Sequence, residues 1–131
     1  MQWQAIYVIA NLARADSRNK FEKIFDKYFA PIPGPAMVTA ANVIKAAAKI
    51  ALARPEMTGR IAAELLKVDR AKYQTAECRN IALGHAMKSF DQFLDHIEDK
   101  EPVIKLVKRH LRNPRSATRR KAERFIARHA D

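Results

Sequence analysis

Cationic side chains dominate the last quarter of the sequence, and the chemistry open to them is the binding of anions. From Val103 to Asp131 the acidic residues are Glu123 and Asp131 alone. The basic residues of this stretch are Lys105, Lys108, Arg109, Arg112, Arg115, Arg119, Arg120, Lys121, Arg124 and Arg128. The whole chain has 25 lysines and arginines against 14 aspartates and glutamates, a net charge of +11. Such an excess attracts polyanions through a long-range, salt-sensitive force.

The spacing of these cations predicts that several of them share helix faces. Four lie opposite the apolar stripe of a helix that we expect to begin at Asp99. Three more recur at every fourth position of the next helix and so form a ridge. We expect the partner-binding residues to be Lys105, Lys108, Arg109 and Arg112 on the first helix and Arg120, Arg124 and Arg128 on the second, with Lys23 and Lys27 as further candidates.

No arrangement in the sequence is typical of catalysis or of metal binding. The four histidines, His85, His96, His110 and His129, do not pair at the spacing of metal ligands on a helix. A glycine-rich phosphate loop and a nucleophile motif are both absent from the sequence. Asp91 and Asp95 lie one helical turn apart, and we interpret them as a solvated acidic face. We therefore expect a non-enzymatic protein without metal or cofactor.

The composition favours helices as the elements that position these residues. The chain is 48% hydrophobic and has only three glycines, and few β-branched residues follow one another. The central element is a helix predicted over residues 75–97, because its apolar residues follow the three-four spacing of a buried face. This face consists of Leu83, Met87, Phe90, Leu94 and Ile97, and a second row of Cys78, Ala82 and Ala86. Two rows must be covered on two sides, so we expect helices packed before and after it.

Six other helices complete a predicted all-α fold of about seven helices. We expect them over residues 3–15, 17–29, 35–54, 55–68, 99–112 and from 116 onward. The first is apolar nearly all round, so we expect a preceding repeat or a partner chain to cover it. The second has the clearest amphipathic pattern, with an apolar stripe of Phe21, Ile24, Phe25, Tyr28 and Phe29.

The single cysteine and the absence of a long apolar run bound the expected location. Cys78 has no second cysteine to pair with, which suits a reducing compartment, and we interpret it as a small buried residue. Lys45 and Lys49 interrupt the richest apolar stretch, so it falls short of a membrane-spanning helix. We expect a soluble cytoplasmic protein with no membrane partner.

Similar sequence recurs at a spacing of forty residues near the C-terminus. Cys78-Arg79-Asn80-Ile81-Ala82 is echoed by Thr118-Arg119-Arg120-Lys121-Ala122. Paired helices with a period near forty resemble the HEAT-repeat family of armadillo-like solenoids. The resemblance implies a right-handed α-α superhelix, formed by residues 1–131 as a single helical-repeat domain or as the C-terminal part of a longer solenoid. It also implies that Arg79, and less directly Arg119, ties one repeat to the next by hydrogen bonds.

The expected function follows from this architecture and from the charge. A helical-repeat scaffold presents a curved surface, so we expect protein–protein interaction with an acidic partner through the partly basic surface. The alternative is a nucleic-acid-binding protein that resembles DNA-repair glycosylase solenoids, whose grooves are basic. Self-association through the apolar helix that contains Trp3 is a third hypothesis.

Overall fold

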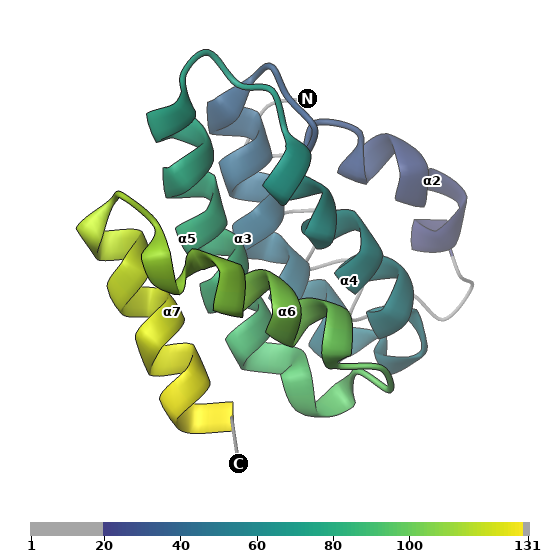
Figure 1. Ribbon diagram of the computed structural model, residues 1–131. Coiled ribbons are helices and arrows are strands. Elements are labelled where there is room, and N and C mark those ends of the chain that lie inside the picture. Colours follow the sequence, from purple (N-terminus) through teal and green to yellow (C-terminus); the bar gives the residue numbers. More distant parts are fainter. Residues whose placement is uncertain (1–19, 130–131) are drawn as a thin grey trace.

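The computed structural model describes residues 20–129, and every regular element in that range is helical (Figure 1). Its six α-helices are α2 (Lys20–Phe29), α3 (Met37–Ala53), α4 (Thr58–Leu66), α5 (Ala76–Phe93), α6 (Glu101–Arg109) and α7 (Ser116–His129). Short 3-10 turns cover Pro55–Met57, Lys67–Arg70, Leu94–His96 and His110–Arg112. The all-α prediction is confirmed for this range. The helix predicted over residues 3–15, and with it Trp3, lies outside the described residues, as does the side chain of Lys23.

The helices form two layers. In one layer α3, α5 and α7 pack side by side in chain order (Figure 1). In the other layer α4 packs against α3 and α5 and also contacts α6. Alanines make the close packing of α3 with α5 feasible, because short side chains let two helices approach. Ala40, Ala47 and Ala51 of α3 and Ala82 and Ala86 of α5 are all fully buried.

The interior is organised around α5, as the sequence predicted. All five residues of the predicted main face are buried, and Phe90 and Phe93 form an aromatic pair with ring centroids 5.9 Å apart. Thr75 caps the helix, since its Oγ1 accepts a hydrogen bond from the Cys78 backbone N–H at 3.1 Å. Cys78 itself is half-buried, so its interpretation as a buried residue is wrong. The α-helical part ends at Phe93, and a 3-10 turn carries Leu94 into the core.

Helix α2 follows its predicted pattern in part. Phe25, Tyr28 and Phe29 are buried and contact one another through their rings. The guanidinium of Arg60 on α4 lies 4.1 Å from the centre of the Phe25 ring and covers it. Ile24, however, is 38% exposed. The predicted stripe is thus wider than the side of α2 that α3 and α4 cover.

Two turns at one end of the molecule are bonded to each other. The turn before α3 contains Gly34, whose φ is 101°. The turn before α5 approaches it, and the Lys72 N–H donates to the Pro33 carbonyl at 2.9 Å. The Tyr73 hydroxyl donates to the Ile32 carbonyl in the same contact. Residues about forty positions apart in the sequence are therefore joined at this end.

The starts of α3, α5 and α7 define a repeat register. These helices begin at Met37, Ala76 and Ser116, about forty residues apart. The same register aligns Val43, Ala82 and Ala122, all of which are fully buried. At this one position, therefore, α3, α5 and α7 each bury a small or medium apolar side chain.

Within residues 20–129 no helix combines the length and the apolarity needed to cross a membrane.

Candidate anion-binding face

Three of the seven predicted partner-binding cations form ion pairs with carboxylates of the protein itself. The Lys105 Nζ lies 3.1 Å from Glu101 Oε1, one turn away on α6. The Arg109 guanidinium donates to Asp69 Oδ2 at 2.8 Å, and Arg128 pairs with Asp91. The other four are exposed and form no ion pair with any residue of 20–129; they are Lys108, Arg112, Arg120 and Arg124. Of the predicted set, three residues are therefore engaged within the protein, and four are available at the surface.

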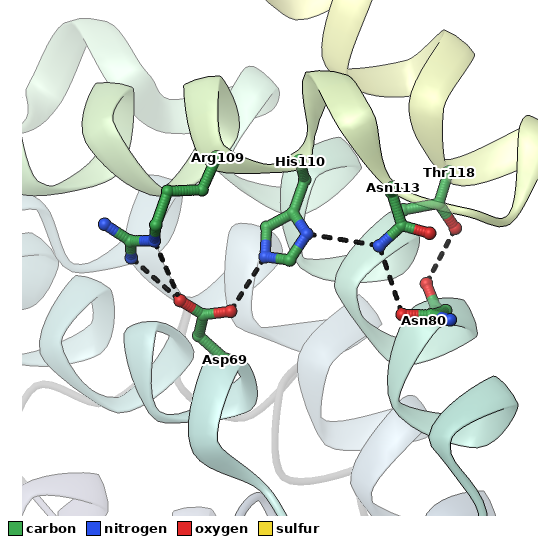
Figure 2. Close-up of polar contacts among 6 residues, drawn as sticks. All are labelled: Asp69, Asn80, Arg109, His110, Asn113 and Thr118. Atoms are coloured by element: carbon green, nitrogen blue, oxygen red, sulfur yellow. Dashed lines mark hydrogen bonds and ion pairs between the residues drawn. The ribbon is translucent and has the colours of Figure 1, made fainter.

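Figure 2 shows the polar network that holds Arg109. Asp69, in the 3-10 turn after α4, accepts hydrogen bonds from Arg109 and pairs with His110 Nε2 at 2.7 Å. The Asn113 side-chain amide donates to His110 Nδ1 and to Asn80 Oδ1, both at 3.1 Å. Since Asn113 donates to Nδ1, the proton of a neutral His110 ring is on Nε2, which faces the carboxylate. The network joins α4, α5, α6 and α7.

Electrostatics agree with a structural role for Asp69. Burial alone would raise its pKa, but the hydrogen bonds from His110 and Arg109 outweigh burial and lower the pKa below its usual range. The carboxylate is thus ionised at neutral pH and fully engaged in the fold. Arg109 is consequently a poor candidate for contact with a partner.

The residue that ties α5 to α7 is Asn80 and not its neighbour Arg79. The Asn80 carbonyl accepts from Thr118 Oγ1 at 2.7 Å, and its side chain accepts from Asn113. The Arg79 side chain forms no hydrogen bond or ion pair with any described residue, so the role that the HEAT resemblance implied for it is not seen. Arg119 donates to the Asn113 carbonyl at 3.1 Å, within the turn before its own helix. The connection between α5 and α7 is thus made by the buried Asn80.

A second group of cations gathers on the layer of α3, α5 and α7. Lys45 of α3 and Lys88 of α5 are exposed, and Lys121 of α7 is half-buried. Gly84 of α5 makes room for Lys121: a Cβ at this glycine would lie 3.3 Å from the Lys121 Nζ and 3.4 Å from its Cδ. The lysine side chain therefore lies across α5 and carries its charge toward the middle of the layer.

His85 lies among these cations. Burial and, after it, the charges of Lys45, Lys121, Lys88 and Arg115 lower its pKa to about 4. At neutral pH the ring is thus neutral, first because it is partly buried and second because of the cations near it. The cations that lower its pKa come from α3, α5, α7 and the turn before α7, and one of them, Arg115, is paired with Glu77 at 2.6 Å. We call His85 and these four residues the cationic face.

Lys121 experiences the same surroundings. Burial and then the charges of Lys88, Arg115, Lys45 and Arg124 lower its pKa. Like charges that repel one another destabilise a fold unless a ligand of opposite charge relieves them. The cationic face therefore has the electrostatic character of an anion-binding site.

A cavity of about 240 Å³ lies beside this face, between α5 and α7. Its walls are Met87, Lys88, Asp91, Lys121, Arg124, Phe125 and Arg128. Asp91 is the one carboxylate among them, and both Arg128 and His129 already bind it. The structure thus brings two predicted residues, Arg124 and Arg128, together with two that the prediction omitted. Lys105 and Arg109 line a different cavity, of about 610 Å³, between α4 and α6.

The sequence contained a signal for one of the omitted lysines, Lys88. In the register of α3, α5 and α7 the thirteenth residue of each helix is a cation: Lys49, Lys88 and Arg128. The predicted ridges instead followed single helices and the C-terminal excess of charge. A search for cations at the period of forty would have found this row, because equivalent positions of stacked helices lie side by side.

Other ligand chemistry has no support in the part of the chain that the structure describes. No group of three histidine, cysteine, aspartate or glutamate side chains converges there as a metal site would require. Asp95 is exposed in the turn after α5, and Asp91 is occupied as described above. Comparison of the chain with protein-family models, with curated proteins and with solved structures gave no match.

The pKa of His85 leads to a prediction about stability. The unfolded chain takes up a proton on this ring near pH 6.5 and the folded protein only near pH 4. The contribution of the neutral ring is therefore complete above pH 6.5 and is lost as the pH falls toward 4. We expect urea denaturation to show a loss of about 1–2 kcal/mol from this group, after solvent screening of a half-exposed ring.

The control is His85→Gln, which removes the titrating ring and keeps a polar side chain. Its free energy of unfolding should fall less between pH 7 and pH 4 than that of the wild type. Equal pH profiles for the two proteins would contradict the assignment.

Proposed function

We propose that the cationic face binds the phosphate backbone of a nucleic acid. The observation that carries the proposal is that Lys45, Lys88 and Lys121 all act on His85 and form no ion pair with any described residue, whereas Arg115, the fourth cation, is paired with Glu77 at 2.6 Å. Half or more of the hydrogen bonds in protein–DNA complexes go to phosphate and sugar, and lysine and arginine supply many of them. Neutralised phosphates release counterions, so such a surface binds with an affinity that falls steeply with salt.

The width of the layer formed by α3, α5 and α7 favours an extended polyanion over a small anion as the ligand. Neighbouring packed helices lie about 8–10 Å apart, so cations on three adjacent helices span about 20 Å. Several phosphates of one strand fit within that length, since B-DNA carries one per strand every ~3.4 Å along its axis. Lys49 and Lys88, at the same register of α3 and α5, extend the charge along this direction, whereas Arg128 at the equivalent position of α7 is paired with Asp91.

We propose further that the chain is a HEAT-like helical-repeat domain with a right-handed superhelical stack. The two layers, the helix pairs and the register of about forty residues support this architecture. In this proposal binding, and not catalysis, is the activity of the chain. A nucleic-acid ligand and a free Cys78 both suit the cytoplasm.

One observation favours protein binding as a second candidate function. Lys108 and Arg112 of the α6 segment are exposed and have no ion pair with any described residue. Of the four cations predicted on this segment, these are the two that carboxylates of the described residues do not pair. Their positive charge suits an acidic protein partner. Pull-down partners that are retained by the wild type and lost by the double variant Lys108→Glu, Arg112→Glu would support this function.

Fluorescence anisotropy with labelled single- and double-stranded oligonucleotides tests the nucleic-acid proposal. We expect micromolar or tighter binding at physiological salt, and a loss of about 100-fold or more in Lys88→Glu, Lys121→Glu, because two phosphate contacts become repulsive. The double variant Lys108→Glu, Arg112→Glu is the matched control, since it changes the net charge by the same amount on another helix.

Two results would contradict the proposal. One is the absence of binding by the wild type at physiological salt. The other is an equal loss of affinity in both double variants, which would show that only the total charge matters.

A further inference from the structure

We propose that one phosphate group of the nucleic acid occupies a defined position between α5 and α7, where Lys88, Lys121 and Arg124 bind it, and that its binding draws a proton from solvent onto His85. The inference rests on the proposed function and adds to it a particular binding position and a linked proton. Helices α5 and α7 pack against each other, and the turn between α6 and α7 lies at one end of the pair (Figure 1).

The cavity between α5 and α7 supplies the space. Its volume of about 240 Å³ accommodates a phosphate group with its bridging oxygens, and its rim carries the Lys88, Lys121 and Arg124 side chains. Met87 and Phe125 form an apolar floor that is buried to 98% or more, so it is closed to a stacked base. The accessible chemistry of the cavity is thus that of its cations.

No carboxylate of the described residues neutralises the three cations at the rim of the cavity, Lys88, Lys121 and Arg124. Asp91 is the carboxylate of the cavity wall, but Arg128 and His129 both bind it. Neither Lys88, Lys121 nor Arg124 forms an ion pair with any residue of 20–129. Gly84 contributes directly, because any larger residue would push the Lys121 Nζ away from α5.

His85 adds the proton linkage. It lies one helical turn before Lys88, and the charges that lower its pKa include Lys45 of α3, Lys121 of α7 and Arg115 in the turn before α7, the last of which is paired with Glu77. A phosphate bound at Lys88 and Lys121 offsets the charge of two of the cations that lower the pKa of His85. The pKa of His85 must then rise from about 4, and by linkage the affinity for phosphate must rise as the pH falls.

The first experiment is an NMR titration of the His85 ring in the full chain. The signal is assigned by its loss in His85→Gln, and the ring is titrated in chloride, in inorganic phosphate and with a saturating oligonucleotide. We expect the pKa of His85 to rise by about one unit or more with the oligonucleotide, and to rise less with inorganic phosphate at millimolar concentration. An unchanged titration in the presence of bound oligonucleotide would overturn the inference.

The second experiment measures the oligonucleotide affinity against pH. Between pH 7.5 and pH 4.5 we expect a gain of about threefold or more for the wild type, as a rise of one unit in the pKa of His85 from about 4 requires, and no such gain for His85→Gln. Lys121→Gln should lower the affinity about tenfold, whereas Arg120→Gln, one residue away on α7 and not part of the cavity, should lower it far less. Equal losses in these two variants would also overturn the inference.

These outcomes separate the inference from the proposed function. Oligonucleotide binding that depends on Lys88 and Lys121 but leaves His85 untouched would retain the function and reject the proton linkage. A pKa shift with inorganic phosphate but no oligonucleotide binding would retain a phosphate site and reject the nucleic-acid ligand.

Discussion

Replacement of Asn113 by alanine is expected to lower the free energy of unfolding by about 2–4 kcal/mol, because it leaves several buried polar groups without partners. The Asn113 side chain is 3% exposed and bonds three elements. It donates to Asn80 on α5 and to His110 after α6, and its Oδ1 accepts from the Arg115 backbone N–H at 2.9 Å. The substitution would therefore weaken the contact of α5 with the segment that connects α6 to α7 (Figure 2).

Urea denaturation monitored by far-UV circular dichroism measures this effect. The matched control is Gln92→Ala, because Gln92 is exposed and its amide donates only to the Lys88 carbonyl within α5, at 3.4 Å. We expect the control to change stability by less than about 0.5 kcal/mol. A loss below about 1 kcal/mol in Asn113→Ala would mean that the network contributes little to the fold.

Replacement of Gly34 by alanine is expected to cost a similar amount, about 2–4 kcal/mol, for a steric reason. A side chain is strained at a φ of 101°, and a Cβ at this position would lie 2.4 Å from the Lys72 carbonyl oxygen. That oxygen belongs to the backbone of the turn before α5. Relief of the overlap would therefore separate the two turns and break the hydrogen bond from Lys72 to Pro33.

Gly59 provides the control in the same chain. It lies in the first turn of α4, and a Cβ there would meet no atom within 4 Å. Because alanine favours the helix over glycine, Gly59→Ala should leave the midpoint of thermal unfolding unchanged or raise it, with a gain of up to about 1 kcal/mol. If both variants behaved alike, the tight approach at Gly34 would be refuted.

Both large effects concern residues that join neighbouring helix pairs. Asn113 connects α5, α6 and α7, and Gly34 lets the turn before α3 meet the turn before α5. In a stack of helix pairs each unit is stabilised mainly by its neighbours, so a change at a junction affects two units at once. Surface cations such as Lys88 should by contrast affect binding far more than stability, since exposed charges contribute little to the fold.

The sequence by itself determined the helices and most of the core. The three-four spacing of apolar residues identified α5 and its buried face, because a helix that buries one side must repeat its apolar residues at that period. Proline at Pro55 and Pro102 and the cap at Thr75 located helix starts to within a few residues. Ile24 and Cys78 were misplaced, because periodicity does not show how much of a stripe the neighbouring helices cover.

Only the tertiary structure decided which charges are free to act. Arg109 and Lys88 look alike in the sequence, yet Arg109 meets Asp69 forty residues away, whereas Lys88 is left among other cations around His85. The energy of a charge depends on the distance to its neighbours and on its burial, and helix packing sets both. The sequence therefore determined how much positive charge the protein carries, and the packing of α3, α5 and α7 determined where that charge remains uncompensated.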